Sequence, residues 1–183
     1  MATITFASSN QNKYLEVQSI LSTQNISVDF SQIDLIELQS DSLEEIAREK
    51  AKAAFAKLRR PVVVEDDGLF IESLGGFPGQ YSSFVFNTIG NDGILKLLSG
   101  SAKRSAYFCS LIAFYNGKTL SISEGRVDGR ISERITGSGG WGYDPIFMPA
   151  TADLTYAELK KSKNEYSHRK RALEKFVQWY LNL

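Results

Sequence analysis

The sequence predicts an α/β fold with a mixed β-sheet flanked by helices, and three observations support this. Strand-like and helix-like patterns alternate early in the chain, which is typical of parallel strands joined by helices. The run Val62-Val63-Val64 is apolar on both faces, as in a strand that is covered on both sides. The pair Asn116-Gly117 between two apolar segments predicts a hairpin, which adds antiparallel strands.

The early part of the chain supplies strands and helices in turn. Thr3 to Ala7 has a strand pattern, and a helix is expected to begin near Asn10. After Ser27 we expect a pair of strands, and Ser42 with Glu45 forms a capping-box pattern that opens a long helix. The apolar positions are Tyr14, Val17, Ile20 and Leu21 in the first helix, Val28, Phe30, Ile33 and Leu35 in the strand pair, and Leu43, Ile46, Ala47, Ala51, Ala54, Phe55 and Leu58 in the long helix.

The remaining elements follow Pro61, which ends the long helix and leads into the valine strand. Asp92 to Leu98 has a helical pattern, and Ser105 to Tyr115 is a long apolar strand. The hairpin returns through Thr119 to Glu124. A last helix is expected from Ser167 to Leu181, with an inward face of Leu173, Phe176, Val177 and Tyr180.

Composition limits the class of protein. The 183 residues are 43% hydrophobic, which predicts one globular domain over residues 1–183. Lys and Arg number 21, as do Asp and Glu, and this balance argues against broad binding to nucleic acid or to a membrane. The single cysteine, Cys109, has no internal disulfide partner, and Met1 to Phe6 lacks a basic leader. We therefore expect a cytoplasmic protein.

The first candidate site is the polar segment Ser8 to Lys13, between a strand and a helix. A helix start offers unpaired N–H groups and a partial positive charge, and Lys13 adds a full charge within the first turn. The spacing of a Walker P-loop is absent. The segment is either an anion site or an ordinary N-cap by Asn10 with a surface lysine.

The second candidate site is Glu65-Asp66-Asp67, directly after the valine strand. The carboxyl ends of strands are where α/β sheets place ligands, and adjacent carboxylates suit Mg²⁺. If the strand continues, Glu65 and Asp66 face opposite sides, so only one of them is a direct ligand. The competing interpretation is an acidic turn before Gly68.

The third candidate site is the glycine-rich segment Gly139 to Pro145. Its glycines let the backbone approach a flat ligand, Trp141 or Tyr143 could stack on a base, and Asp144 could accept a hydrogen bond from a ring N–H. The alternative is a tight turn that carries core aromatics.

The fourth candidate site lies at the start of the last helix. Arg169 could donate to a carbonyl oxygen of a ligand, and Lys163 could bind phosphate. His168 is the only histidine, which excludes a pair of catalytic histidines. The surrounding lysines and arginines favour a solvated face over a nucleic-acid patch. Taken together, the four segments indicate a nucleoside triphosphate site.

Five ordered motifs resemble the inosine triphosphate pyrophosphatase family over essentially the whole chain. They are S-S-N-x-x-K, V-E-D-D-G-L, L-G-G-F-P-G-x-Y-S, G-W-G-Y-D-P-I-F and S-H-R. The resemblance implies Mg²⁺-dependent hydrolysis of ITP, dITP and XTP to the monophosphate and pyrophosphate. It also implies a homodimer whose subunits have an elongated mixed sheet.

The resemblance also implies roles for individual residues. Asp66 matches the metal ligand and proton acceptor, and Glu37 falls at a metal-binding position. Trp141 stands where Phe is common, Asp67 where Ser or Thr is usual, and Ser83 where a basic residue is frequent. The matched substrate contacts are Ser8, Ser9, Asn10, Gln11, Asn12, Lys13, Lys50, Asp67, Trp141, Gly142, Tyr143, Asp144, Lys163, His168 and Arg169.

Two other functions are consistent with a nucleotide site. One is a related hydrolase of modified pyrimidine or methylated guanosine triphosphates, against which the S-H-R and G-W-G-Y-D motifs argue. The other is a nucleotide sensor without turnover, against which the acidic cluster argues. Release of pyrophosphate from ITP in the presence of Mg²⁺ would decide against the sensor.

Overall fold

The computed structural model describes residues 2–36 and 38–183, which form two compact units. The domain expected over residues 1–183 stays a prediction. Glu37 lies outside the described residues. The first unit comprises the chain up to Asp66, Ser110–Gly125 and Arg169–Leu183, and the second unit comprises Asp67–Cys109 and Arg126–His168.

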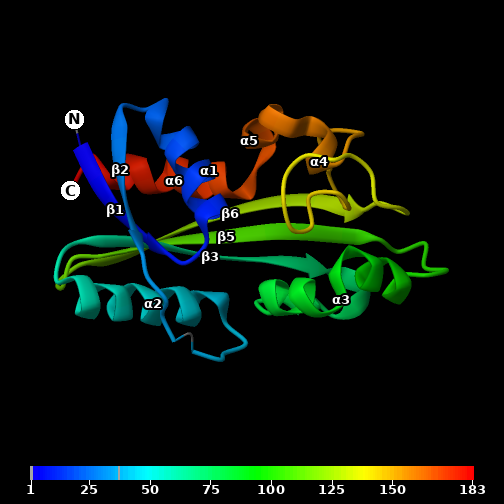
Figure 1. The fold of residues 1–183 in the computed structure, drawn as a ribbon, viewed down its shortest axis with the longest axis horizontal. Coiled ribbons are helices and arrows are strands. Elements are labelled where there is room, and N and C mark those ends of the chain that lie inside the picture. Colours follow the sequence, from blue (N-terminus) through cyan, green and yellow to red (C-terminus); the bar gives the residue numbers. More distant parts are fainter. Residues whose placement is uncertain (1, 37) are drawn as a thin grey trace. The chain divides into compact units, whose positions relative to one another are not determined.

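The strands form one mixed sheet in the order β2-β1-β3-β5-β6-β7, with β4 paired to β3 (Figure 1). β1 runs parallel to both β2 and β3, whereas β4 is antiparallel to β3 and β7 to β6. The predicted mixed sheet flanked by helices is therefore confirmed. The strands are β1 (Ala2–Ser8), β2 (Ile26–Gln32), β3 (Val62–Ile71), β4 (Pro78–Gly79), β5 (Ser105–Tyr115), β6 (Leu120–Ile131) and β7 (Phe147–Pro149).

Two of the helices, α1 and α2, begin where the sequence places capping residues. Asn10 caps α1, and the Ser42 hydroxyl accepts the N–H of Glu45 at 3.3 Å at the start of α2. None of the helices in the described part of the chain is long and apolar enough to cross a membrane. The helices are α1 (Gln11–Ser22), α2 (Leu43–Leu58), α3 (Ser82–Leu97), α4 (Tyr156–Leu159), α5 (Lys163–Tyr166) and α6 (His168–Tyr180), with short 3₁₀ turns at Glu72–Leu74 and Lys160–Ser162.

Two expected elements differ from the structure. The expected strand pair after Ser27 is one strand, β2, which ends at Gln32. Residues 33–36 belong to no strand and include no Gly or Asn that could form a hairpin turn. The helix expected at Asp92–Leu98 begins earlier, at Ser82, and Gly90 interrupts it with φ 60° and ψ −163°. Figure 1 shows α3 as two consecutive helical segments, and this break hides the first segment from a periodicity search.

Each unit has its own apolar core. In the first unit, β1, α1 and α6 pack through buried side chains such as Phe6, Leu21 and Phe176. In the second unit, Phe108, Phe147 and Tyr156 form the aromatic part of the core. The inward face predicted for the last helix is confirmed for Leu173, Phe176 and Val177, which are at most 4% exposed.

Strand register in the first unit aligns two of the predicted segments. Phe6 of β1 lies opposite Val63 of the parallel strand β3, so Ser8 is level with Glu65 two residues further along. The polar turn at the carboxyl end of β1 is therefore level with the acidic segment within β3. The carboxyl ends of strands are where α/β sheets bind ligands.

Candidate active site

The polar turn after β1 is an N-cap built from its own side chains. Oδ1 of Asn10 accepts the backbone N–H groups of Asn12 and Lys13 at 2.9 and 3.2 Å. Oγ of Ser8 accepts the N–H of Asn10 at 3.1 Å. The first turn of α1 has no acidic residue that would offset the positive end of the helix dipole. The N-cap that we considered as an alternative is present, and it leaves the electrostatics of an anion site in place.

The acidic segment is part of a strand rather than a turn. β3 continues through Ile71, so Glu65 and Asp66 point to opposite faces of the sheet, as the alternation predicts. Asp66 is 8% exposed, and its Oδ1 lies 3.5 Å from Nζ of Lys50 on α2. The structure thus pairs the predicted metal carboxylate with the predicted phosphate-binding lysine.

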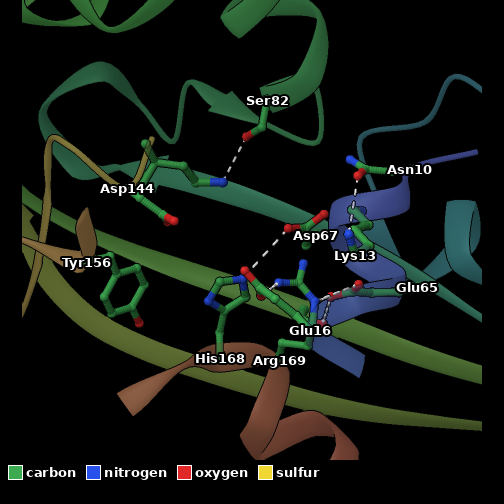
Figure 2. Close-up of polar contacts among 12 residues, drawn as sticks. Asn10, Lys13, Glu16, Glu65, Asp67, Ser82, Asp144, Tyr156, His168 and Arg169 are labelled. Atoms are coloured by element: carbon green, nitrogen blue, oxygen red, sulfur yellow. Dashed lines mark hydrogen bonds and ion pairs between the residues drawn. The ribbon is translucent and has the colours of Figure 1, made fainter. Parts of the chain in front are cut away.

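Glu65, on the other face, belongs to a buried charge network of the first unit. Its two carboxylate oxygens each accept Nε of Arg169 at 2.8 Å, and Oγ of Ser110 donates to Oε1 at 2.6 Å. Nη1 of Arg169 contacts the carboxylate of Glu16 on α1, and Figure 2 shows the guanidinium between the two acids. The side chains of Arg169 and Glu65 are 1% and 0% exposed. Arg169 is therefore ordered by the protein itself, with two of its nitrogens directed to carboxylates.

In the second unit, His168 lies beside Asp67. Nε2 of His168 is 3.7 Å from Oδ2 of Asp67, and the histidine is 3% exposed (Figure 2). Its ring stacks on Phe108, with centroids 4.5 Å apart and planes 9° apart. The ring position is thus fixed by aromatic packing, beside the carboxylate of Asp67.

The glycine-rich loop of the second unit folds back on Asp144. Oδ2 of Asp144 accepts the N–H of Trp141 at 3.0 Å and Nζ of Lys163 at 2.8 Å. Gly140 has φ +73°, and a Cβ there would lie 2.1 Å from Oδ2 of Asp144, so only glycine fits. Lys163 is 5% exposed, and its Nζ lies 5.5 Å from the centroid of the Trp141 ring.

The two aromatic residues of this loop have different surroundings. Tyr143 is 4% exposed, packs edge-on against Phe86, and donates its hydroxyl to the carbonyl oxygen of Ser82 at 2.8 Å. Burial raises the pKa of Tyr143 well above its usual value, so the phenol stays a donor. Trp141 is only half-buried. A stacking role for a side chain in this loop therefore falls to Trp141.

Sequence reasoning did not find two members of the buried network, Glu16 and Ser110. Glu16 is 153 residues from Arg169 along the chain, and Ser110 is 45 residues from Glu65, so no local pattern marks either one. The feature of the sequence that could have identified Glu16 was its acidic side chain, one turn after Lys13 on the same helix. In the described ranges 2–36 and 38–183, no cluster of three or more His, Cys, Asp or Glu residues could hold a metal ion.

Comparison with known proteins covers almost the full chain. Residues 4–179 match the Ham1 family. A protein of Methanopyrus kandleri named dITP/XTP pyrophosphatase is 49% identical over 182 residues, covering 98% of this chain and 96% of that protein. A dITP/XTP pyrophosphatase of Saccharolobus solfataricus is 47% identical over 171 residues, covering 93% of this chain and 89% of that protein.

Solved structures give the same result. The structure of a HAM1 protein from Coxiella burnetii superposes with a TM-score of 0.86 at 31% identity, and each chain is covered to 100%. The Ham1 protein of Staphylococcus aureus has a TM-score of 0.81 at 29% identity, with 97% of this chain and 98% of that chain covered. The resemblance drawn from the five motifs is confirmed, and the chain belongs to the Ham1 family.

Proposed function

We propose that this chain hydrolyses aberrant purine nucleoside triphosphates, namely ITP, dITP and XTP, to the nucleoside monophosphate and pyrophosphate. One observation carries the proposal, the 49% identity over 98% of the chain to a protein named dITP/XTP pyrophosphatase. The activity would remove damaged purines from the nucleotide pool. We place this reaction in the cytoplasm, because the chain has a single cysteine and so no internal disulfide.

The phosphate groups are assigned to the first unit. Lys13 and the amino-terminal end of α1 supply positive charge, and Lys50 supplies a second cation beside Asp66. These groups would hold the triphosphate and stabilise the charge that develops on its oxygens during hydrolysis. Because the work is electrostatic, losing one lysine should weaken binding of the triphosphate more than binding of a nucleoside.

The cofactor assigned to this site is Mg²⁺. The donor set fits it, because Mg²⁺ binds through one or two carboxylates, waters and substrate phosphates, and Asp66 within β3 offers carboxylate oxygens. Glu37 is the second proposed ligand and lies outside the described residues. Bound Mg²⁺ would neutralise phosphate charge and lower the pKa of water.

The hydrolysis itself requires one proton acceptor. Water attacks the α-phosphorus, the bond to the bridging oxygen breaks, and pyrophosphate leaves with the electron pair. We assign the proton of the attacking water to Asp66, which is a carboxylate next to the cation of Lys50.

The purine base is assigned to Trp141, Gly142, Tyr143 and Asp144 with Lys163, His168 and Arg169. Trp141 would stack on the base, and Asp144 would accept a ring N–H. An arginine only donates, so Arg169 suits the O6 carbonyl of hypoxanthine or xanthine and not the amino group of adenine. Nε and Nη1 of Arg169 contact Glu65 and Glu16, and these two contacts fix the orientation of the guanidinium.

Assays of pyrophosphate release test the function. Wild-type protein with Mg²⁺ should release pyrophosphate from dITP and XTP far faster than from dATP, measured by chromatography of the nucleotides, and EDTA should stop turnover. Asp66→Asn should abolish turnover while the protein stays folded, whereas Asp153→Asn, at a fully exposed side chain, should not change it.

Four results would overturn parts of this assignment. If Asp66→Asn keeps more than about a tenth of the rate, a change below ~1.4 kcal/mol, its catalytic role is wrong. Equal rates with dITP and dATP would refute the purine specificity. Faster turnover of methylated guanosine or modified pyrimidine triphosphates would favour the related hydrolase. Binding without pyrophosphate release would favour a nucleotide sensor.

The homodimer implied by the resemblance is part of the proposal. Phe84 on α3 is 69% exposed, the highest value for a large apolar side chain among the described residues of the second unit. A second copy of the chain would cover it. Sedimentation should show a dimer that Phe84→Ser weakens and Leu154→Ser does not, and a wild-type monomer would refute the assembly.

A further inference from the structure

The glycine-rich loop of the second unit is attached to α3 at two points. The Tyr143 hydroxyl donates to the carbonyl oxygen of Ser82 at 2.8 Å, and Nδ2 of Asn91 donates to the carbonyl oxygen of Gly142 at 3.1 Å. Ser82 and Asn91 lie on opposite sides of the break at Gly90. Each segment of the broken helix therefore supplies one hydrogen bond to the loop.

The bond from Asn91 has a direction. Its Nδ2 is engaged with Gly142, while its Oδ1 is buried and has no hydrogen-bond partner among the described residues. The side chain thus acts as a donor at this place, and an acceptor there would face another acceptor, the carbonyl oxygen of Gly142. Burying Oδ1 without a partner is unfavourable, so the hydrogen bond from Nδ2 to Gly142 is the contact that stabilises this side-chain position.

This contact fixes the backbone directly after Trp141. The N–H of Trp141 is held by Asp144 at 3.0 Å, and the carbonyl group of Gly142 is held by Asn91. Gly142 has φ +62°, and a Cβ there would meet nothing within 4 Å, so packing does not restrain it. The hydrogen bonds therefore set the position of the Trp141 backbone.

We propose that Asn91 is a positioning residue for base recognition, which holds the Trp141 loop in place for the purine ring. The inference rests on the proposed function, because Trp141 is the side chain assigned to stack on the base. In this proposal Asn91 itself contacts neither the base nor the phosphates. It acts on affinity for the base, because a loop that is already ordered loses less entropy when the ligand binds.

The test compares Asn91→Asp with Asn87→Asp, a change of the same kind at an exposed position of α3 one turn earlier. Asn91→Asp exchanges the donor for an acceptor at nearly constant shape. It should raise KM for dITP about tenfold, because the hydrogen bond to Gly142 is lost and the new carboxylate oxygen repels the carbonyl oxygen of that residue. The kcat should change less than KM.

Two further readouts separate positioning from a general loss of structure. Inorganic tripolyphosphate has no base, so its inhibition constant should be the same in wild type and Asn91→Asp. Trp141 and Trp179 are the two tryptophans of the chain, so a Trp179→Phe background reports Trp141 alone. In that background Asn91→Asp should increase quenching of Trp141 fluorescence by iodide, and Asn87→Asp should not.

Parallel rises in KM for dITP and in the inhibition constant of tripolyphosphate would overturn the proposal, as would unchanged KM and unchanged quenching. The quenching measurement needs no substrate. If wild-type protein fails to turn over dITP, the proposed function fails, and an unchanged quenching result separately refutes the loop contact.

Discussion

Removing the guanidinium of Arg169 should lower the free energy of unfolding by about 3–5 kcal/mol, because a buried charge then loses its partner. Glu65, the partner, has a side chain that is 0% exposed, and both of its oxygens accept Nε of Arg169 at 2.8 Å. In Arg169→Met the carboxylate of Glu65 keeps only Ser110 as a hydrogen-bond donor among the contacts described above.

The other members of the network set a scale for this loss. Ser110→Ala removes one hydrogen bond to a charged acceptor and should cost about 1.5–3 kcal/mol. Replacing both Glu65 and Arg169 with Met removes the buried charges together, so the double variant should recover most of the loss.

Urea unfolding followed by circular dichroism measures these differences, with unchanged m-values as the check that only stability has moved. For a chain of this size each kcal/mol corresponds to about 2–4 °C, so Arg169→Met should lower Tm by about 6–20 °C. Arg171→Met, at an exposed position of the same helix, is the matched control. A loss below about 1 kcal/mol for Arg169→Met, the range of an exposed ion pair, would refute the buried network.

Three further predictions concern the site. Lys13→Ala should raise KM for dITP and leave weak binding of the bare nucleoside unchanged, whereas equal effects on both would remove Lys13 from the phosphate site. In Arg169→Ala the ratio of kcat/KM for ITP over ATP should collapse, mainly through loss of ITP activity, and an unchanged ratio in the folded fraction would exclude this residue from base recognition. Tyr143→Phe should destabilise the protein at neutral pH through loss of the bond to Ser82. Burial raises the pKa of this tyrosine above its ordinary value of 10.0, so the unfolded chain loses the phenol proton first, and stability contributed by the neutral phenol falls as pH rises above about 10. The gap in unfolding free energy between wild type and Tyr143→Phe should therefore shrink in alkali, and a gap that stays constant to pH 11 would contradict the raised pKa.

The sequence was most informative where the cause of a structure is local. The strand Ser105–Tyr115 has the predicted bounds, and Asn10 and Ser42 cap helices as expected, because caps and periodicity depend on neighbouring residues. The opposite directions of Glu65 and Asp66 followed from strand alternation alone. The interrupted helix α3 was only half predicted, since the break at Gly90 is itself a departure from the period that identifies helices.

The sequence by itself thus determined the α/β class, most elements, the family, and the segments that carry the candidate site. It could not determine which charges neutralise one another. Lys50 with Asp66, Lys163 with Asp144, and Arg169 with Glu65 were predicted one by one as ligands or contacts, and the tertiary structure joined them as pairs. The reason is physical, since Arg169 and Glu65 are 104 residues apart and meet only when the packing of α6 against β3 buries both. Once buried, each charge requires a partner, and only the folded backbone decides which partner is within reach.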